Sequence, residues 1–275
     1  MYATFPLCES QSSYTESTSF WYRATVTEAE TQSGTQTDSR GTLGTVRNAA
    51  LLLDLLSDGP AHQQLTDLAE RSGLSLPTVH RLLRSLTVAG LVEQDPRSAR
   101  YGLGPELVRL SQRYLARLPV LTALSPYLLP VRDALHTSVH IVLYARGSVA
   151  YVDRADSADI GPYREPHRVE PALRTAPGRI LAAHADDPGW DAALALVDSA
   201  ERALATDERS HWRSATHLTL AAAERGGTEV AVPVLDAYGH PAAALAATVA
   251  DGAVPQAAAH LIRAAQAASR TLGHG

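Results

Sequence analysis

The stretch from Leu65 to Leu103 has the residue pattern of two short helices joined by a tight turn and followed by a small β-ribbon. Leu65–Arg71 is amphipathic, and Gly73 after it supplies the left-handed conformation that ends a helix at low cost. Ser75 is a favoured N-cap residue for a second helix, which we expect to run to about Ala89. The segment is therefore predicted to be a helix-turn-helix.

The second of these helices has two distinct faces. Apolar residues recur at helical spacing on the face that we expect to be buried: Val79, Leu82, Leu83 and Leu86. The opposite face is polar and carries arginine: Thr78, His80, Arg81, Arg84 and Ser85. A polar, arginine-bearing helix after a tight turn is suited to enter the DNA major groove. The sequence therefore predicts a DNA-binding element.

A wing and a preceding helix complete the expected domain. Two short strands, Leu91–Asp95 and Arg100–Leu103, flank a turn at Pro96–Ala99. Val46–Leu56 is an amphipathic helix that ends near Pro60, and it would form a three-helix core with the two helices of the turn motif. We expect a winged helix-turn-helix domain over residues 44–104.

Charge is distributed unevenly along a chain whose formal net charge is −5. Residues 41–118 carry nine arginines against seven acids, whereas residues 1–43 and 119–275 are net negative. A mildly positive DNA-binding segment favours a site-specific protein with few phosphate contacts over a protein that coats DNA non-specifically.

Composition excludes several function classes. All 24 basic residues are arginine, so Schiff-base chemistry, a Walker A loop and a kinase-type catalytic lysine are ruled out. The single cysteine, Cys8, excludes an internal disulfide framework and a cysteine zinc site, and it fits a reducing compartment. No apolar run approaches the ~20 residues of a membrane span, and no secretion signal is recognisable. We expect a cytoplasmic protein without a membrane contact.

The segments on either side of the winged helix differ in character. Residues 1–43 are rich in Ser and Thr and are expected to form a disordered tail, unless the cluster Phe20-Trp21-Tyr22 docks on the folded part. Residues 105–118 are expected to form a linker helix, stopped by Pro119, with an apolar stripe that includes Leu107 and Leu110. A short helical stretch should follow, to about Leu135.

The remaining chain, assigned to residues 119–275 as one domain, has a mixed α/β pattern. Strand hairpins are expected at 139–144 with 148–154 and at 228–235 with 242–249. Residues 155–172 look loop-rich, and the segments predicted to be helical are 179–184, 192–204, 218–225 and 255–272. The fold class is therefore α+β, with an antiparallel-sheet domain after the winged helix.

Three stretches in this order resemble the IclR family of bacterial transcriptional regulators. They are Thr78–Leu86 with the wing to Gly104, Pro171–Ala182, and Ala231–Asp236 with Gly239. The resemblance covers roughly residues 44–272. It implies a winged helix, a linker helix that helps the chain to dimerise, and a C-terminal GAF-like domain that binds a small-molecule effector. Members act as repressors or activators, as homodimers or dimers of dimers on an operator in double-stranded DNA.

The recognition helix and its surroundings supply the candidate DNA contacts. Arg81 and Arg84 can bind guanine bidentately or hold phosphate, and Thr78 and His80 lie where base edges or phosphates are reached. Phosphate and minor-groove contacts are assigned to arginines outside this helix, each of which is otherwise an ordinary exposed charge. The full candidate set is Arg47, Ser75, Thr78, His80, Arg81, Arg84, Arg97 and Arg100.

The resemblance also places an effector site in the C-terminal domain, at the start of the helix near Gly178 and on the late hairpin. Arg174 and Glu229 depart from the residues common in relatives, and they could bind the two ends of a zwitterion or neutralise each other. The alternative is a domain that has lost ligand binding and mediates assembly only. The candidate set is Arg174, Thr175, Ala176, Gly178, Thr219, Glu229, Ala246 and Thr248.

A rival function class stays open at this point. The chain could be a metabolite-binding protein or an enzyme whose winged helix contacts another protein. The absence of lysine and of a nucleophile motif weighs against an enzyme, and we expect no catalytic residue and no cofactor. His136 and His140 are four residues apart, but 140 lies in an expected strand and no acidic or cysteine partner accompanies them, so we expect no metal site.

Overall fold

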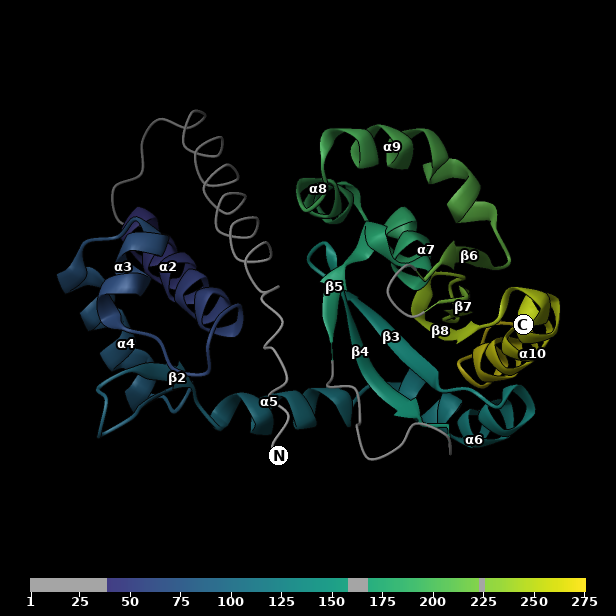
Figure 1. Ribbon diagram of the computed structural model, residues 1–275, viewed down its shortest axis with the longest axis horizontal. Coiled ribbons are helices and arrows are strands. Elements are labelled where there is room, and N and C mark those ends of the chain that lie inside the picture. Colours follow the sequence, from purple (N-terminus) through teal and green to yellow (C-terminus); the bar gives the residue numbers. More distant parts are fainter. Residues whose placement is uncertain (1–38, 158–167, 223–225) are drawn as a thin grey trace, which may run out of the picture. The chain divides into compact units, whose positions relative to one another are not determined.

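The computed structural model describes residues 39–157, 168–222 and 226–275 (Figure 1). The described chain divides into two compact units, one ending at Arg113 and the other beginning at Tyr114. Residues 1–38 of the predicted tail lie outside the described residues, whereas the first helix already begins at Ser39. No helix in the described ranges is long and apolar enough to cross a membrane.

The N-terminal unit contains the predicted winged helix-turn-helix. Its helices are α2 (Ser39–Ser57), α3 (Leu65–Ser72) and α4 (Leu76–Val88), and its strands are β1 (Val92–Gln94) and β2 (Tyr101–Leu103). The antiparallel register pairs Glu93 with Gly102. The turn between α3 and α4 closes at Gly73, whose φ of 69° is the left-handed value expected from the sequence.

Apolar faces of the three helices form the core of this unit. Val79, Leu82, Leu83 and Leu86 of α4 are buried, as their spacing predicts, and they pack with Leu52, Leu55 and Leu56 of α2. Burying that one face leaves the polar face of α4 at the surface. The position of the recognition helix is therefore fixed by its apolar side.

Gln63 joins three elements of this unit and was not singled out by sequence. Its side-chain Nε2 donates to the carbonyl of Leu55 at 2.9 Å, and its Oε1 accepts from Arg71 at 2.6 Å. Its backbone exchanges two 2.8 Å hydrogen bonds with Tyr101 of the wing. This buried amide satisfies carbonyl groups left open at the end of α2 and ties the wing to the helices.

The linker region forms two helices, α5 (Glu106–Leu115) and α6 (Pro119–Leu135). Sequence reasoning took Pro119 as the stop of the first helix and expected only a short helical stretch after it. Pro119 instead occupies the first turn of α6, where a missing N–H costs nothing. Pro126 and Pro130 lie inside α6 without ending it.

A six-stranded antiparallel sheet forms the centre of the C-terminal unit, in the order β5-β4-β3-β8-β7-β6. Both predicted hairpins are confirmed, and two edge strands were not predicted. The strands are β3 (Val139–Ala145), β4 (Ser148–Ala155), β5 (Val169–Pro171), β6 (Leu218–Ala221), β7 (Thr228–Leu235) and β8 (Pro241–Val249).

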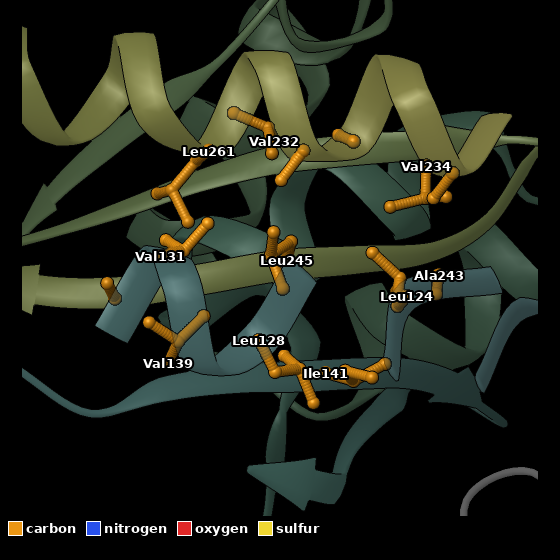
Figure 2. Close-up of a cluster of buried hydrophobic side chains, with 14 of the residues drawn as sticks. Leu124, Leu128, Val131, Val139, Ile141, Val232, Val234, Ala243, Leu245 and Leu261 are labelled. Carbon is orange, nitrogen blue, oxygen red and sulfur yellow. The ribbon is translucent and has the colours of Figure 1, made fainter. Parts of the chain in front are cut away.

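Helices cover both faces of this sheet (Figure 1). On one face, α6 and α10 (Val254–Thr271) bury Leu124, Leu128 and Leu261 against the inward residues of β3, β7 and β8 (Figure 2). The other face is covered by the 3₁₀ turn η1 and three helices: η1 (Ala172–Arg174), α7 (Ala176–His184), α8 (Asp187–Ala195) and α9 (Ser199–Ser214). This second face contains the α7 N-terminus to which an effector site was assigned.

Two predictions for this unit were wrong. Residues 192–204 are not one helix, because Asp198 caps a new helix and forms a capping box with Glu201. Residues 218–221 of the predicted helix 218–225 form the edge strand β6, and 223–225 lie outside the described residues. Pairing with β7 overrides the helical preference of the alanines there.

Candidate functional site

The polar face of α4 is exposed and free of internal ion pairs. His80, Arg81 and Arg84 are all exposed, and Thr78 is half-buried. Among the residues that the structure describes, the guanidinium groups of Arg81 and Arg84 have no hydrogen-bond or ion-pair partner. Exposed arginines without an acidic neighbour keep their full charge and all their donors for an external anion or base edge.

The start of α4 differs in detail from the expectation. Ser75 is the N-cap residue, but its hydroxyl does not accept from a backbone N–H of the first turn. It lies 2.8 Å from the hydroxyl of Thr78, and both groups are next to the exposed side chain of Leu76. The first-turn N–H groups are therefore not capped by Ser75. This end of the helix presents the hydroxyls of Ser75 and Thr78 together with the apolar side chain of Leu76.

The tip of the wing is held by Asp95. Its carboxylate accepts from the backbone N–H of Arg97 at 3.0 Å and from both the N–H and the hydroxyl of Ser98. The hydrogen bonds from Ser98 and Arg97 lower the pKa of Asp95 below its usual value. This turn presents the exposed side chains of Arg97 and Arg100, while Arg47 is exposed on α2.

In the C-terminal unit, the carboxylate of Glu229 lies at the start of α7. Its Oε2 accepts from the backbone N–H of Ala176 at 2.8 Å, and its Oε1 accepts from the hydroxyl of Tyr151 at 3.0 Å. Arg168 lies 3.6 Å from the same Oε1 and stacks over the Tyr151 ring at 3.9 Å. Burial, and secondly the charge of Glu229, raise the pKa of Tyr151.

Arg174 does not share a site with Glu229. Its guanidinium makes two 3.1 Å bonds to the carboxylate of Glu201 on α9, and its side chain is about half exposed. The expectation that these two groups present opposite ends of one pocket is therefore not supported by their geometry. The positive neighbour of Glu229 is Arg168, which the sequence analysis did not name.

The other residues assigned to the effector site are divided between the two faces of the sheet. Thr175 and Ala176 are buried at the N-terminus of α7, and Ala246 is buried on the sheet face that this helix covers. Thr248 pairs with Glu229 in the β7–β8 register, so both side chains point to the α7 face. Thr219 alternates with Leu218 and Leu220, which pack on the α7 side, and therefore points to the opposite face.

A cavity of about 580 Å³ opens beside this cluster, at the end of the sheet where β3 begins and β8 ends. Its lining includes His140, Thr248 and an ion pair. In this pair Arg154 Nε lies 2.9 Å from Asp156 Oδ1. The ring of His140 contacts Tyr151 edge-on, with a centroid distance of 5.6 Å. In the described ranges no group of three His, Cys, Asp or Glu side chains is arranged to hold a metal.

Comparison with known proteins identifies the architecture. Residues 45–96 match the model of the IclR helix-turn-helix domain. A solved IclR regulator from Silicibacter sp. is 25% identical, with a TM-score of 0.71 over 84% of this chain and 97% of that one. The N-terminal unit thus resembles the IclR helix-turn-helix domain, and the described chain has the fold of a solved IclR regulator. The matched residues span α2 to the wing, and the structural likeness extends over the C-terminal sheet.

Two further similar proteins are informative. The glycerol operon regulatory protein of Streptomyces coelicolor is 35% identical over 142 residues, which are 50% of this chain and 55% of that protein. The chain thus spans about half the length of the curated relatives it matches. An IclR homologue from Microbacterium hydrocarbonoxydans, solved with 4-hydroxybenzoate, has the same fold at 18% identity, with a TM-score of 0.60 over 84% of this chain and all of that one.

Proposed function

We propose that this protein is a sequence-specific DNA-binding transcriptional regulator. The observation that carries the proposal is the face of α4, where Arg81 and Arg84 project from a helix whose other side is buried. An α-helix fits the B-DNA major groove, and an arginine fork matches the paired acceptors of guanine. Thr78, Ser75 and His80 would contact bases or phosphates near the N-terminus of α4.

The remaining DNA contacts would come from the wing and α2. Arg97 lies in the Asp95 turn, Arg100 follows it, and Arg47 is exposed on α2. These arginines are suited to phosphates, because a flexible, extended cation needs no base-specific geometry for that contact. We assign residues 44–104 to DNA binding, 105–118 to the linker and 119–275 to effector binding.

Two winged helices would act together on a pseudo-palindromic operator. Leu107, Leu110 and Tyr114 recur along α5 at helical spacing, and the last two are 45% and 60% exposed. Pairing of this stripe with its copy would bury apolar surface and present two recognition helices. A dimer, or a dimer of dimers, in the cytoplasm is the assembly we propose.

The C-terminal unit would bind a small molecule that changes operator affinity. Two features support this: the cavity beside Thr248, and the 4-hydroxybenzoate held by a homologue of the same fold. The ligand class for this chain depends on its own residues around Glu229. No catalytic role is assigned, in keeping with relatives that are regulators.

An electrophoretic shift tests the proposal against its rival. The full-length protein is titrated onto the DNA upstream of its own coding region, with unrelated DNA of equal length as competitor. A shifted band that survives the competitor and is lost in the Arg81→Ala Arg84→Ala double variant supports a regulator. A protein that binds both DNAs equally, or neither, supports the metabolite-binding or enzymatic alternative, in which the winged helix contacts a protein.

A further inference from the structure

The N–H groups in the first turn of α7 are all accounted for. The N–H of Ala176 donates to Glu229, and the N–H of Gly178 donates to the Thr175 hydroxyl at 3.1 Å. Pro177 has no N–H, and Arg179 already donates to the Thr175 carbonyl at 3.1 Å. A helix N-terminus attracts anions because it exposes such donors. Here no donor is left for an anion from outside.

The group that fills this position is itself a carboxylate. Glu229 is only 8% exposed, and its two oxygens are held by three different elements: α7 through Ala176, β4 through Tyr151, and the segment before β5 through Arg168. A free carboxylic acid bound at the same position would be held by a similar set of donors. The chain therefore supplies from its own side chain a carboxylate that accepts from the first N–H group of α7.

We propose that the Glu229 carboxylate permanently occupies the anion position, by which we mean the place next to the Ala176 N–H at the start of α7. Glu229 would thereby be a specificity-determining residue of the effector domain. A ligand carboxylate brought to Ala176 would meet a negative charge at contact distance, and two such groups cannot both stay ionised. Glu229 thus excludes carboxylic acids from this position and restricts effectors to molecules that present no carboxylate there. This inference rests on the proposed effector-binding function of the C-terminal unit.

Space for such an effector remains on the neighbouring strand, although Glu229 itself does not line it. The 580 Å³ cavity shares Thr248 with the face on which Glu229 lies, and Thr248 is the cross-strand neighbour of Glu229. The charged residues in the described lining, Arg154 and Asp156, already neutralise each other. The Thr137 hydroxyl donates to the Thr248 carbonyl at 2.9 Å. His140 and the Thr248 hydroxyl in the lining then favour an uncharged polar molecule with hydroxyl or amide groups.

The test uses acetate as the probe, because Glu229→Ala removes a volume and a charge equal to one acetate ion. Thermal unfolding of the full-length protein is followed in increasing sodium acetate, with sodium chloride at equal ionic strength and acetamide as the uncharged counterpart. We expect acetate to raise the unfolding temperature of Glu229→Ala saturably, by several degrees. Acetamide should not do so, and the wild type should respond to acetate no more than to chloride.

A matched control is Glu170→Ala, which removes another carboxylate that pairs with Arg168 at 2.8 Å but does not contact α7. It should gain no response to acetate. Equal responses of wild type and Glu229→Ala, or equal effects of acetate and acetamide on Glu229→Ala, would overturn the proposal. If Glu229→Ala is unfolded in chloride, acetate should restore its circular dichroism spectrum, and failure to restore it is equally decisive against the proposal.

The DNA shift assay is run on the same preparations, which separates this inference from the proposed function. A wild-type protein that shifts DNA while Glu229→Ala shows no acetate response contradicts only the role of Glu229. If Glu229→Ala responds to acetate but the wild type does not shift DNA, the role of Glu229 is supported and the proposed function as a DNA-binding regulator is contradicted.

Discussion

The carboxylate of Glu229 on β7 accepts a 2.8 Å hydrogen bond from the backbone N–H of Ala176, 53 residues earlier in the chain. This contact joins the sheet to the first turn of α7. Gly178 contributes to the same junction, because a Cβ at that position would come within 2.1 Å of the Ala172 carbonyl oxygen. The contact leaves the first N–H group of α7 bound to a side chain of the protein itself.

Tyr151 gives this cluster a predicted pH dependence. Burial first, and the charge of Glu229 second, raise the pKa of Tyr151 above its usual value of 10.0. The folded protein therefore keeps a proton that the unfolded chain releases above pH 10, so stability is full below pH ~10 and falls as the pH rises further. Urea unfolding between pH 8 and 11, followed by tryptophan fluorescence, should show a steeper loss for wild type than for Tyr151→Phe.

At pH 8, Tyr151→Phe should itself cost about 1–3 kcal/mol, because the buried carboxylate loses one of its donors. Tyr238→Phe is the control, since Tyr238 is 85% exposed. Identical pH profiles for wild type and Tyr151→Phe would contradict the raised pKa of Tyr151.

Gln63 is expected to be the most sensitive polar residue of the N-terminal unit. Gln63→Ala removes the 2.9 Å bond to the Leu55 carbonyl and the 2.6 Å bond from Arg71, and leaves only the longer 3.3 Å bond between those two groups, which should cost about 1–3 kcal/mol. Gln64→Ala is a matched control, because Gln64 is exposed and its side chain does not cap α3. Hydrogen exchange of the α3 and wing amides should accelerate in Gln63→Ala only, and equal rates in both variants would argue against this role.

Leu110 tests the proposed dimer. Leu110→Glu places a charge in the stripe of α5 and should raise the dimer dissociation constant at least tenfold by the cost of burying an unpaired carboxylate. Gln112→Glu adds the same charge on another side of the helix and should leave assembly unchanged. Sedimentation analysis at micromolar concentration measures both, and a wild type that is monomeric there contradicts the assembly.

Arg100 is expected to contact a phosphate of the DNA backbone and not a base. Arg100→Ala should weaken binding to all DNA sequences by a similar factor and reduce the salt slope of log K by roughly 0.9, the value for one lost phosphate contact. Binding isotherms at four salt concentrations provide the slope. A change confined to the specific site, with an unaltered slope, would mean that Arg100 reads a base instead.

The winged helix could be predicted from sequence because its signals are local. The apolar spacing of α4, the glycine after α3 and the N-cap at Ser75 each act within a few residues. The capping box of Asp198 and Glu201 was an equally local signal, and recognising it would have divided the predicted helix 192–204 correctly. The residues of β6 form a strand because they pair with β7, and β7 lies later in the chain, so no local signal distinguishes β6 from a helix.

The effector region was harder to predict because its contacts span long sequence separations. Arg174 finds Glu201, 27 residues later, while Glu229 reaches back to Ala176 and Tyr151. The resemblance placed Arg174 at a helix start and Glu229 on the late hairpin, and their opposite charges suggested one pocket. The distance between the two groups cannot be obtained from sequence. Thr219 was assigned without knowledge of β6, whose alternation directs it to the other face.

The central claim is that the exposed face of α4 reads DNA sequence. Selection of bound sites from random-sequence duplex DNA by the full-length protein tests it most directly. The account predicts an enriched pseudo-palindrome with half-sites about 10 base pairs apart, on which Arg81→Ala binds more weakly by about 1–3 kcal/mol. The control Arg263→Ala, an exposed arginine on α10, should bind that site like wild type. No enriched sequence, or an Arg81→Ala variant with wild-type affinity, would contradict the account.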